Sequence, residues 1–135
     1  MEQLLRDGLA SLGLPADGIP ALLRYSDLLV EKNKVMNLTA ITEPDAVAQL
    51  HLLDSAAILQ FVGLKGKKVV DVGTGAGFPG MPLRILEDDF DLTLLDLRYA
   101  QASAALTNEK KYAAVLCFYG MDTLAAHEIL YKLNV

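Results

Sequence analysis

The stretch Lys68-Val69-Val70-Asp71-Val72-Gly73-Thr74-Gly75-Ala76-Gly77-Phe78-Pro79-Gly80 decides the fold of this chain. Its first part, residues 68–72, is short, rich in β-branched residues and followed by a glycine, which predicts a buried strand of a parallel sheet. The glycine-rich part leads into residues 81–87, which we expect to form a helix. This order of strand, loop and helix is the context in which a glycine-rich loop binds a ligand.

The rest of the chain extends this pattern in both directions. Downstream, residues 92–96 and 113–119 are predicted strands, and residues 100–111 and 123–132 are predicted helices. Strands that alternate with helices imply a parallel sheet with right-handed crossovers. Upstream, leucines at helical spacing predict one helix that ends at Gly13 and a second from Pro20 to residues 33–37. A third helix is expected to start at Thr42, whose hydroxyl would cap it.

The fold class is therefore α/β: N-terminal helices followed by a partial Rossmann-like parallel sheet. We divide the chain into an N-terminal helical segment, residues 1–64, and a partial cofactor-binding domain, residues 65–135, which together form one compact unit.

Composition narrows the function classes further. The chain has 135 residues, 53% of them hydrophobic, and no apolar run long enough to cross a bilayer. The net charge of −5 argues against broad, non-specific binding to nucleic acid. A single cysteine, Cys117, cannot form an internal disulfide, which fits a cytoplasmic location.

The glycine loop suggests a specific ligand chemistry. Glycine allows positive φ angles and carries no Cβ, so that a ligand can lie against the backbone. The N–H groups at the start of the following helix are expected to receive an anionic group, which in S-adenosylmethionine is the methionine carboxylate. Asp71, two residues before the first glycine, is expected to orient the loop and to balance the positive charge of the ligand.

Asp96 ends the next predicted strand. Ligands of open α/β sheets bind beyond the carboxyl ends of the strands, where a carboxylate can accept hydrogen bonds from both ribose hydroxyls. The alternative is that Asp96 only caps the helix that follows it.

A nicotinamide dinucleotide is the rival ligand, because residues 75–80 also match G-x-G-x-x-G. Two features argue against it. Pro79 and Pro82 crowd the region where a dinucleotide fold packs its helix on the strand, and the Asp-x-Gly-x-Gly-x-Gly pattern is more typical of loops that bind a methyl donor.

Four segments then carry a resemblance to a known family: Asn37-Leu38-Thr39-Ala40-Ile41, His51-Leu52-Leu53-Asp54-Ser55, residues 71–82, and Leu94-Leu95-Asp96. In this order and spacing, over about residues 20–97, the chain resembles the RsmG (GidB) family of bacterial methyltransferases. The resemblance implies that the partial sheet is of the class I methyltransferase type. It also implies S-adenosyl-L-methionine as cofactor and a guanine N7 of 16S ribosomal RNA, in the small ribosomal subunit, as target.

The same resemblance implies a set of site residues. Gly73 and Phe78 would contact the cofactor, Asp71, Thr74, Gly75 and Gly77 would shape its loop, and Asp96 would bind the ribose. The N-terminal helices would flank the site, where His51 could help to hold RNA or the target base. A structural role is the alternative for His51. We expect no metal site and, since no apolar run is long enough to cross a bilayer, no membrane partner.

The chain departs from the family after Asp96, where Arg98 stands in place of a Lys-Arg pair. About three strands fit into the length, so that one sheet edge would be open to self-association. A second interpretation follows: a non-catalytic fragment or interaction protein that keeps the nucleus of the fold.

Overall fold

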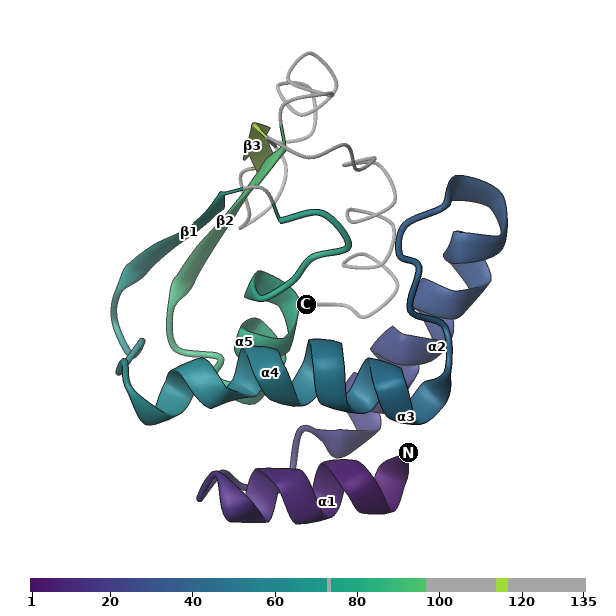
Figure 1. Ribbon diagram of the computed structural model, residues 1–135. Helices are drawn as coiled ribbons and strands as arrows, with labels where there is room; N and C mark the ends of the chain where they lie inside the picture. Colours follow the sequence, from purple (N-terminus) through teal and green to yellow (C-terminus); the bar gives the residue numbers. More distant parts are fainter. Residues whose placement is uncertain (73, 97–113, 117–135) are drawn as a thin grey trace.

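The computed structural model describes residues 1–72, 74–96 and 114–116 (Figure 1). Predictions for residues 100–111 and 123–132 lie outside this part of the chain. Within it, the order of elements is as follows: α1 (Glu2–Ser11), α2 (Ile19–Met36), α3 (Pro44–Val47), a π-helical stretch η1 (Ala48–Leu53), α4 (Asp54–Ala56), a 3₁₀ helix η2 (Ala57–Gln60), β1 (Lys68–Val72), α5 (Gly80–Leu86), β2 (Asp91–Asp96) and β3 (Ala114–Leu116).

The sheet is parallel, as expected, and its strands are ordered β1-β2-β3. The register pairs Lys68 with Asp91 and Val72 with Leu95, so the carboxyl ends of β1 and β2 lie side by side. Because β3 pairs with β2, β1 is an edge strand among the described residues. The observed bounds agree with the predicted strands for β1 and β2, and β3 falls inside the range predicted for a third strand.

The helices cover one face of this sheet. Helix α5 contacts both β2 and α4, so it lies between the sheet and the helical run of residues 44–60, with α1 packed beyond that run (Figure 1). Alternation along the strands gives this arrangement, because Leu92 and Leu94 are buried whereas Val70 is half-exposed on the opposite face. The α/β prediction is thus confirmed for the described residues.

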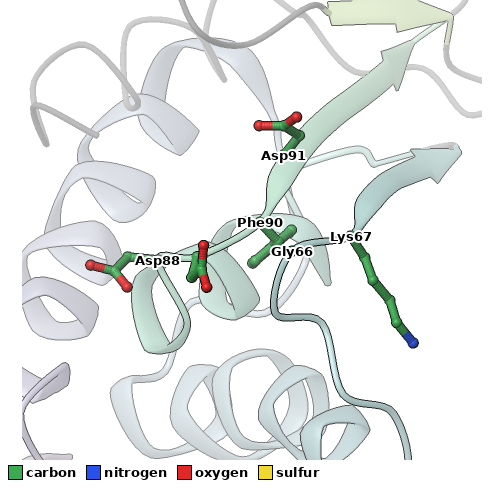
Figure 2. A pocket seen from close by; sticks show the side chains of 6 residues that line it. Gly66, Lys67, Asp88, Phe90 and Asp91 are labelled. Atoms are coloured by element: carbon green, nitrogen blue, oxygen red, sulfur yellow. The ribbon is translucent and has the colours of Figure 1, made fainter.

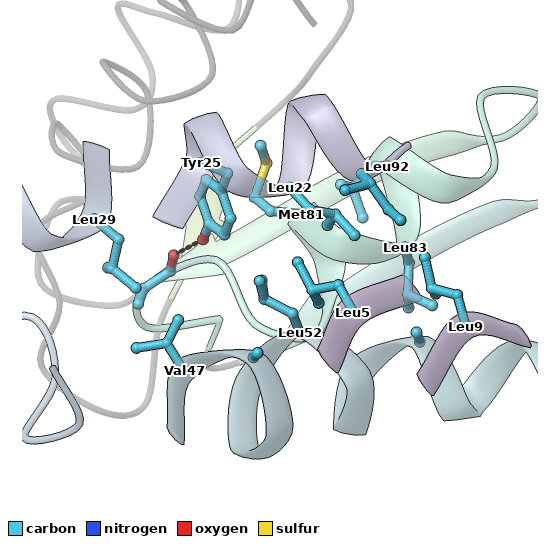
Figure 3. Packing of buried hydrophobic residues seen from close by; sticks show 14 of the residues in the cluster. Leu5, Leu9, Leu22, Tyr25, Leu29, Val47, Leu52, Met81, Leu83 and Leu92 are labelled. Carbon is cyan, nitrogen blue, oxygen red and sulfur yellow. Dashed lines mark hydrogen bonds between the residues drawn. The ribbon is translucent and has the colours of Figure 1, made fainter. Parts of the chain in front are cut away.

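The hydrophobic core joins the N-terminal helices to the sheet side (Figure 3). Leu5 and Leu9 of α1 and Leu22 and Leu29 of α2 are completely buried, and they share one cluster with Leu92 of β2. Burial of each such leucine contributes about 1.5–3 kcal/mol. The amphipathic leucine spacing that predicted α1 and α2 therefore marks the faces that pack.

One detail of the helix starts was wrong. Glu43, not Thr42, is the N-cap of α3, and no side chain caps this end. Pro44 begins the helix, as its fixed φ angle favours, and the main chain closes the first turn with a bond from Val47 N to Glu43 O. Thr42 lies one position before the N-cap, and its hydroxyl makes no capping hydrogen bond.

Candidate functional site

Asp71 organises the loop that follows β1. Its carboxylate is buried, and one oxygen, Oδ2, accepts a hydrogen bond from Thr74 Oγ1 at 2.7 Å and another from Gly80 N at 2.8 Å. These bonds connect the end of the strand to the middle of the loop and to the first residue of α5. Asp71 therefore holds the loop in shape, as the sequence suggested.

The electrostatics of Asp71 follow from its position. Burial raises the pKa of the Asp71 carboxyl above its ordinary value, whereas the hydrogen bonds from Thr74 and Gly80 lower it and offset part of that effect. The carboxylate is thus an anion with reduced hydration, for which a cationic group nearby would be favourable.

Two glycines of the loop adopt backbone conformations that other residues rarely take. Gly75 has φ +55° and Gly77 has φ +93°. A Cβ on Gly77 would also lie 2.6 Å from Met81 Cγ and 2.7 Å from the hydroxyl of Tyr25. The loop can therefore pack this closely on α2 and α5 only with glycine at position 77.

The structure corrects the expectation that the amides at the start of α5 bind the cofactor carboxylate. Gly77 N and Phe78 N donate to Thr74 O, Gly80 N donates to Asp71, and Met81 N donates to Gly77 O. Prolines at positions 79 and 82 have no N–H to offer. The amides of this turn already have partners, because the loop itself provides the acceptors.

Tyr25 of α2 supports the same loop, and sequence reasoning missed it. Its hydroxyl donates to the carbonyl oxygen of Ala76, a contact between residues 51 positions apart, and its ring is completely buried (Figure 3). Burial, and next the charge of Asp71, raise the pKa of the Tyr25 hydroxyl well above its ordinary value, so that it stays protonated and donates. The available signal was a tyrosine among core leucines, since a buried phenol needs a hydrogen-bond partner.

Two of the segments that carried the resemblance meet at Phe78. The ring of His51, in η1, stacks on the ring of Phe78 with centroids 4.3 Å apart and 6° between planes. Tyr25 meets Phe78 edge-on, with centroids 5.5 Å apart. Thr39 Oγ1 lies 3.0 Å from His51 Nε2 and accepts a hydrogen bond from Ile41 N. The N-terminal helical segment thus holds the loop through side chains.

Leu52, Leu53 and Ser55 of the segment 51–55 pack inside the molecule, whereas Asp54 is exposed. Leu52 is completely buried, and Ser55 Oγ donates to His51 O at 2.5 Å. Leu53 packs where a Cβ on Gly8 of α1 would come within 2.4 Å of it. A π-helical stretch was not predicted, because a single shifted turn leaves no clear pattern in the sequence.

The expected site residues fall into two groups. Asp71, Thr74, Gly75, Gly77 and Phe78 share one loop, and His51 contacts it through Phe78. The backbone of Asp96 ends β2 beside the end of β1, on the loop side of the sheet. Gly73 lies outside the described residues.

A polar pocket of about 260 Å³ lies at the other end of the strands (Figure 2). Its lining residues are Gly66, Lys67, Asp88, Asp89, Phe90 and Asp91. These residues precede β1 or lie at the start of β2, so the pocket is separate from the glycine loop. Within residues 1–72, 74–96 and 114–116, no group of three or more histidine, cysteine or acidic side chains is placed to hold a metal ion. No helix in the same residues is long and apolar enough to span a membrane.

Comparison with known proteins points to one family. A profile described as GidB, rRNA small subunit methyltransferase G, matches residues 18–103. A protein of Symbiobacterium thermophilum named "Ribosomal RNA small subunit methyltransferase G" is 50% identical over 96 residues, which is 69% of this chain and 39% of that protein. Its namesake from Caldanaerobacter subterraneus is 39% identical over 126 residues, 90% of this chain and 51% of that protein.

A third relative of the same name, from Stutzerimonas stutzeri, is 44% identical over 97 residues, or 70% of this chain and 45% of that protein. The chain thus spans about two fifths to one half of the length of these relatives. The profile match includes the glycine loop, Tyr25, His51 and most of the helical segment that supports the loop. This chain belongs to the rRNA small subunit methyltransferase G (GidB) family.

Proposed function

We propose that this chain forms the cofactor-binding part of an S-adenosylmethionine-dependent methyltransferase that acts on 16S ribosomal RNA. The observation that carries the proposal is the loop of residues 74–80, which is tied to the buried carboxylate of Asp71 at the carboxyl end of β1. Ligands of open α/β sheets bind at this end. The names of the relatives supply the reaction class and the RNA.

The residues of the loop fit the proposed cofactor in charge and in space. Asp71 provides an anion near a ligand whose sulfonium and ammonium groups are cationic. Gly75 lies partly exposed at a positive φ angle, where a missing Cβ leaves the backbone open to a ligand. Since the amides of residues 77, 78, 80 and 81 have internal partners, we assign the carboxylate of the cofactor to amides earlier in the loop, at residues 74–76.

The remaining assignments follow the resemblance. Phe78 and Gly73 contact the cofactor, and Asp96 accepts hydrogen bonds from the ribose. The backbone position of Asp96, beside the end of β1, supports this assignment. Its neighbour on the same edge, Val72, leads directly into the loop.

The chemistry asks little of the protein beyond alignment. The cofactor supplies an electrophilic methyl group. Guanine N7 has a lone pair in the plane of the ring and loses no proton on methylation, so the chain needs no general base. Holding N7 in line with the methyl group is a matter of proximity and orientation, which can contribute about 7–11 kcal/mol.

The test is methyl transfer from tritiated S-adenosylmethionine to isolated small ribosomal subunits that lack the modification. Incorporation that maps to one guanine N7 of 16S RNA supports the proposal. Binding of the cofactor without incorporation would favour the second interpretation, a fragment that keeps the nucleus of the fold. That interpretation has its own support, because the chain spans only 39% of one relative and 51% of another.

The cytoplasm, where ribosomal subunits are found, is the proposed location. We also propose that the edge of β1, which pairs with no second strand among the described residues, permits self-association; β1 also carries the half-exposed Val70. Sedimentation velocity over a range of concentrations tests this, and a monomer at all concentrations would contradict it.

A further inference from the structure

The imidazole of His51 lies between two loops of the chain. Its plane is parallel to that of Phe78 within 6° at 4.3 Å, and its Nε2 is 3.0 Å from the hydroxyl of Thr39. Thr39 is itself fixed, because its amide donates to Asn33 Oδ1 at 2.7 Å and its Oγ1 accepts from Ile41 N at 3.0 Å. The ring thereby links the end of α2 to the glycine loop.

These contacts engage one face and one nitrogen of the His51 ring within the chain. Phe78 covers one face of the ring, and the Thr39 hydroxyl engages Nε2. The main-chain carbonyl of His51 accepts from Ser55. The Thr39 hydroxyl accepts from Ile41 N and can donate its own hydrogen to Nε2. In that arrangement the neutral ring carries its proton at Nδ1.

Phe78 is the point at which this link can act on the loop. Its amide donates to Thr74 O at 2.9 Å, so a shift of the Phe78 ring moves the turn that Asp71 also holds. The edge of Tyr25 fixes the ring from another side. Removal of the His51 ring would therefore leave one face of the Phe78 ring without its stacked neighbour.

We propose that His51 is a positioning residue: it holds the cofactor loop in its binding conformation by stacking on Phe78 rather than by contacting RNA or the target base. The proposal deepens the proposed function, because the affected property is the affinity for the cofactor. Affinity falls in proportion to the fraction of molecules whose loop is in the binding conformation.

Calorimetric titration with S-adenosylhomocysteine tests this on the chain and on three variants. His51→Ala is expected to bind about five- to tenfold more weakly, a loss of the size associated with one aromatic contact. His51→Phe, which keeps the stack, is expected to restore affinity to within about twofold of the unchanged chain. Gln49→Ala, an exposed position in the same helical stretch, is the matched control and should bind normally.

Amide hydrogen exchange of residues 74–78 gives a readout that does not need the cofactor. Exchange should be faster in His51→Ala than in the unchanged chain and normal in His51→Phe. Equal exchange and equal affinity in all variants would overturn the positioning role. An unchanged chain that binds no S-adenosylhomocysteine, but shows faster exchange in His51→Ala, would instead contradict the proposed function alone.

Discussion

At the scale of single residues, the conformation of the glycine loop depends on close contacts and hydrogen bonds made by two residues, Gly77 and Asp71. Gly77 combines a positive φ angle with close neighbours on two helices, Tyr25 and Met81. Asp71 uses one oxygen to hold both the turn at Thr74 and the start of α5. Substitution of Gly77 should mainly lower the stability of the fold, whereas substitution of Asp71 should mainly lower the affinity for the ligand.

Gly77→Ala is expected to lower the free energy of unfolding by about 2–4 kcal/mol, because it adds backbone strain and a steric clash. Urea denaturation measures this change. Gly13→Ala is the matched control: its φ angle is +70°, but a Cβ there meets nothing within 4 Å. It should therefore cost only the backbone strain, about 1–2 kcal/mol. Equal losses in the two variants would show that the loop is not packed as described.

Asp71→Asn tests the charge of the loop. The amide oxygen can still accept from Thr74 and Gly80, whereas the buried charge is removed. Because burial raises the pKa of Asp71 in the folded chain above its ordinary value of 3.8, the folded state binds more protons than the unfolded state between those two pKa values. Stability of the unchanged chain should therefore fall as pH rises through this window.

In Asp71→Asn this fall in stability should be absent, and the free energy of unfolding at pH 7 should equal or exceed that of the unchanged chain. Urea denaturation between pH 3 and pH 7 provides the comparison. Affinity for S-adenosylhomocysteine should nevertheless drop about tenfold or more, since the anion near the cationic ligand is lost. Unchanged affinity would exclude a role for the Asp71 charge.

At the scale of elements, the main finding is that helix α2 supports the loop that follows β1. Tyr25 reaches Ala76 O, and the turn after α2 holds His51 through Thr39. The N-terminal helices are therefore part of the candidate site, and not only a cover for the sheet. The boundary that we proposed between residues 64 and 65 separates segments whose side chains meet at the loop.

Tyr25→Phe should reveal the strength of this support. The variant keeps the ring but leaves the buried carbonyl of Ala76 without its donor, which should cost about 1–3 kcal/mol of stability. Thermal unfolding measures the loss. The control is Leu28→Met, in the same helix. It should leave the stability nearly unchanged, because the substitution conserves side-chain volume at a partly buried position. If Tyr25→Phe were equally neutral, the bond to Ala76 would carry no weight.

The elements themselves were largely readable from sequence. Leucine spacing predicted α1 and α2, and β-branched runs predicted β1 and β2, because burial on one face or between layers imposes those patterns. The helix start at Thr42 and the π-helical stretch around His51 were not predictable in detail. Both depend on a shift of one residue, which changes hydrogen bonding without changing the hydrophobic pattern.

The candidate site was predictable only in part. Asp71 and the glycines of its loop carry a local pattern that identified them directly. Tyr25, Thr39 and His51 come together through long-range packing, and no spacing along the chain reveals that contact. For residues 77–82 the local pattern was misleading. It suggested amides free to bind a ligand, but in the folded loop these amides donate to acceptors of the loop and to Asp71.

At the scale of the whole molecule, the chain joins a helical layer and a parallel sheet of the methyltransferase G family through one core. It spans about half of the length of its relatives or less. The glycine loop and its helical supports lie within the matched region, residues 18–103. We therefore predict that the chain contains the residues needed to bind the cofactor.

The most direct test is calorimetric titration of this chain with S-adenosylhomocysteine, with NADH as the control ligand. We predict one binding site for S-adenosylhomocysteine with a Kd of about 10 μM, equivalent to about −7 kcal/mol, and no binding of NADH. A folded chain that binds NADH but not S-adenosylhomocysteine, or neither ligand, would contradict the claim that this loop is a site for the methyl donor.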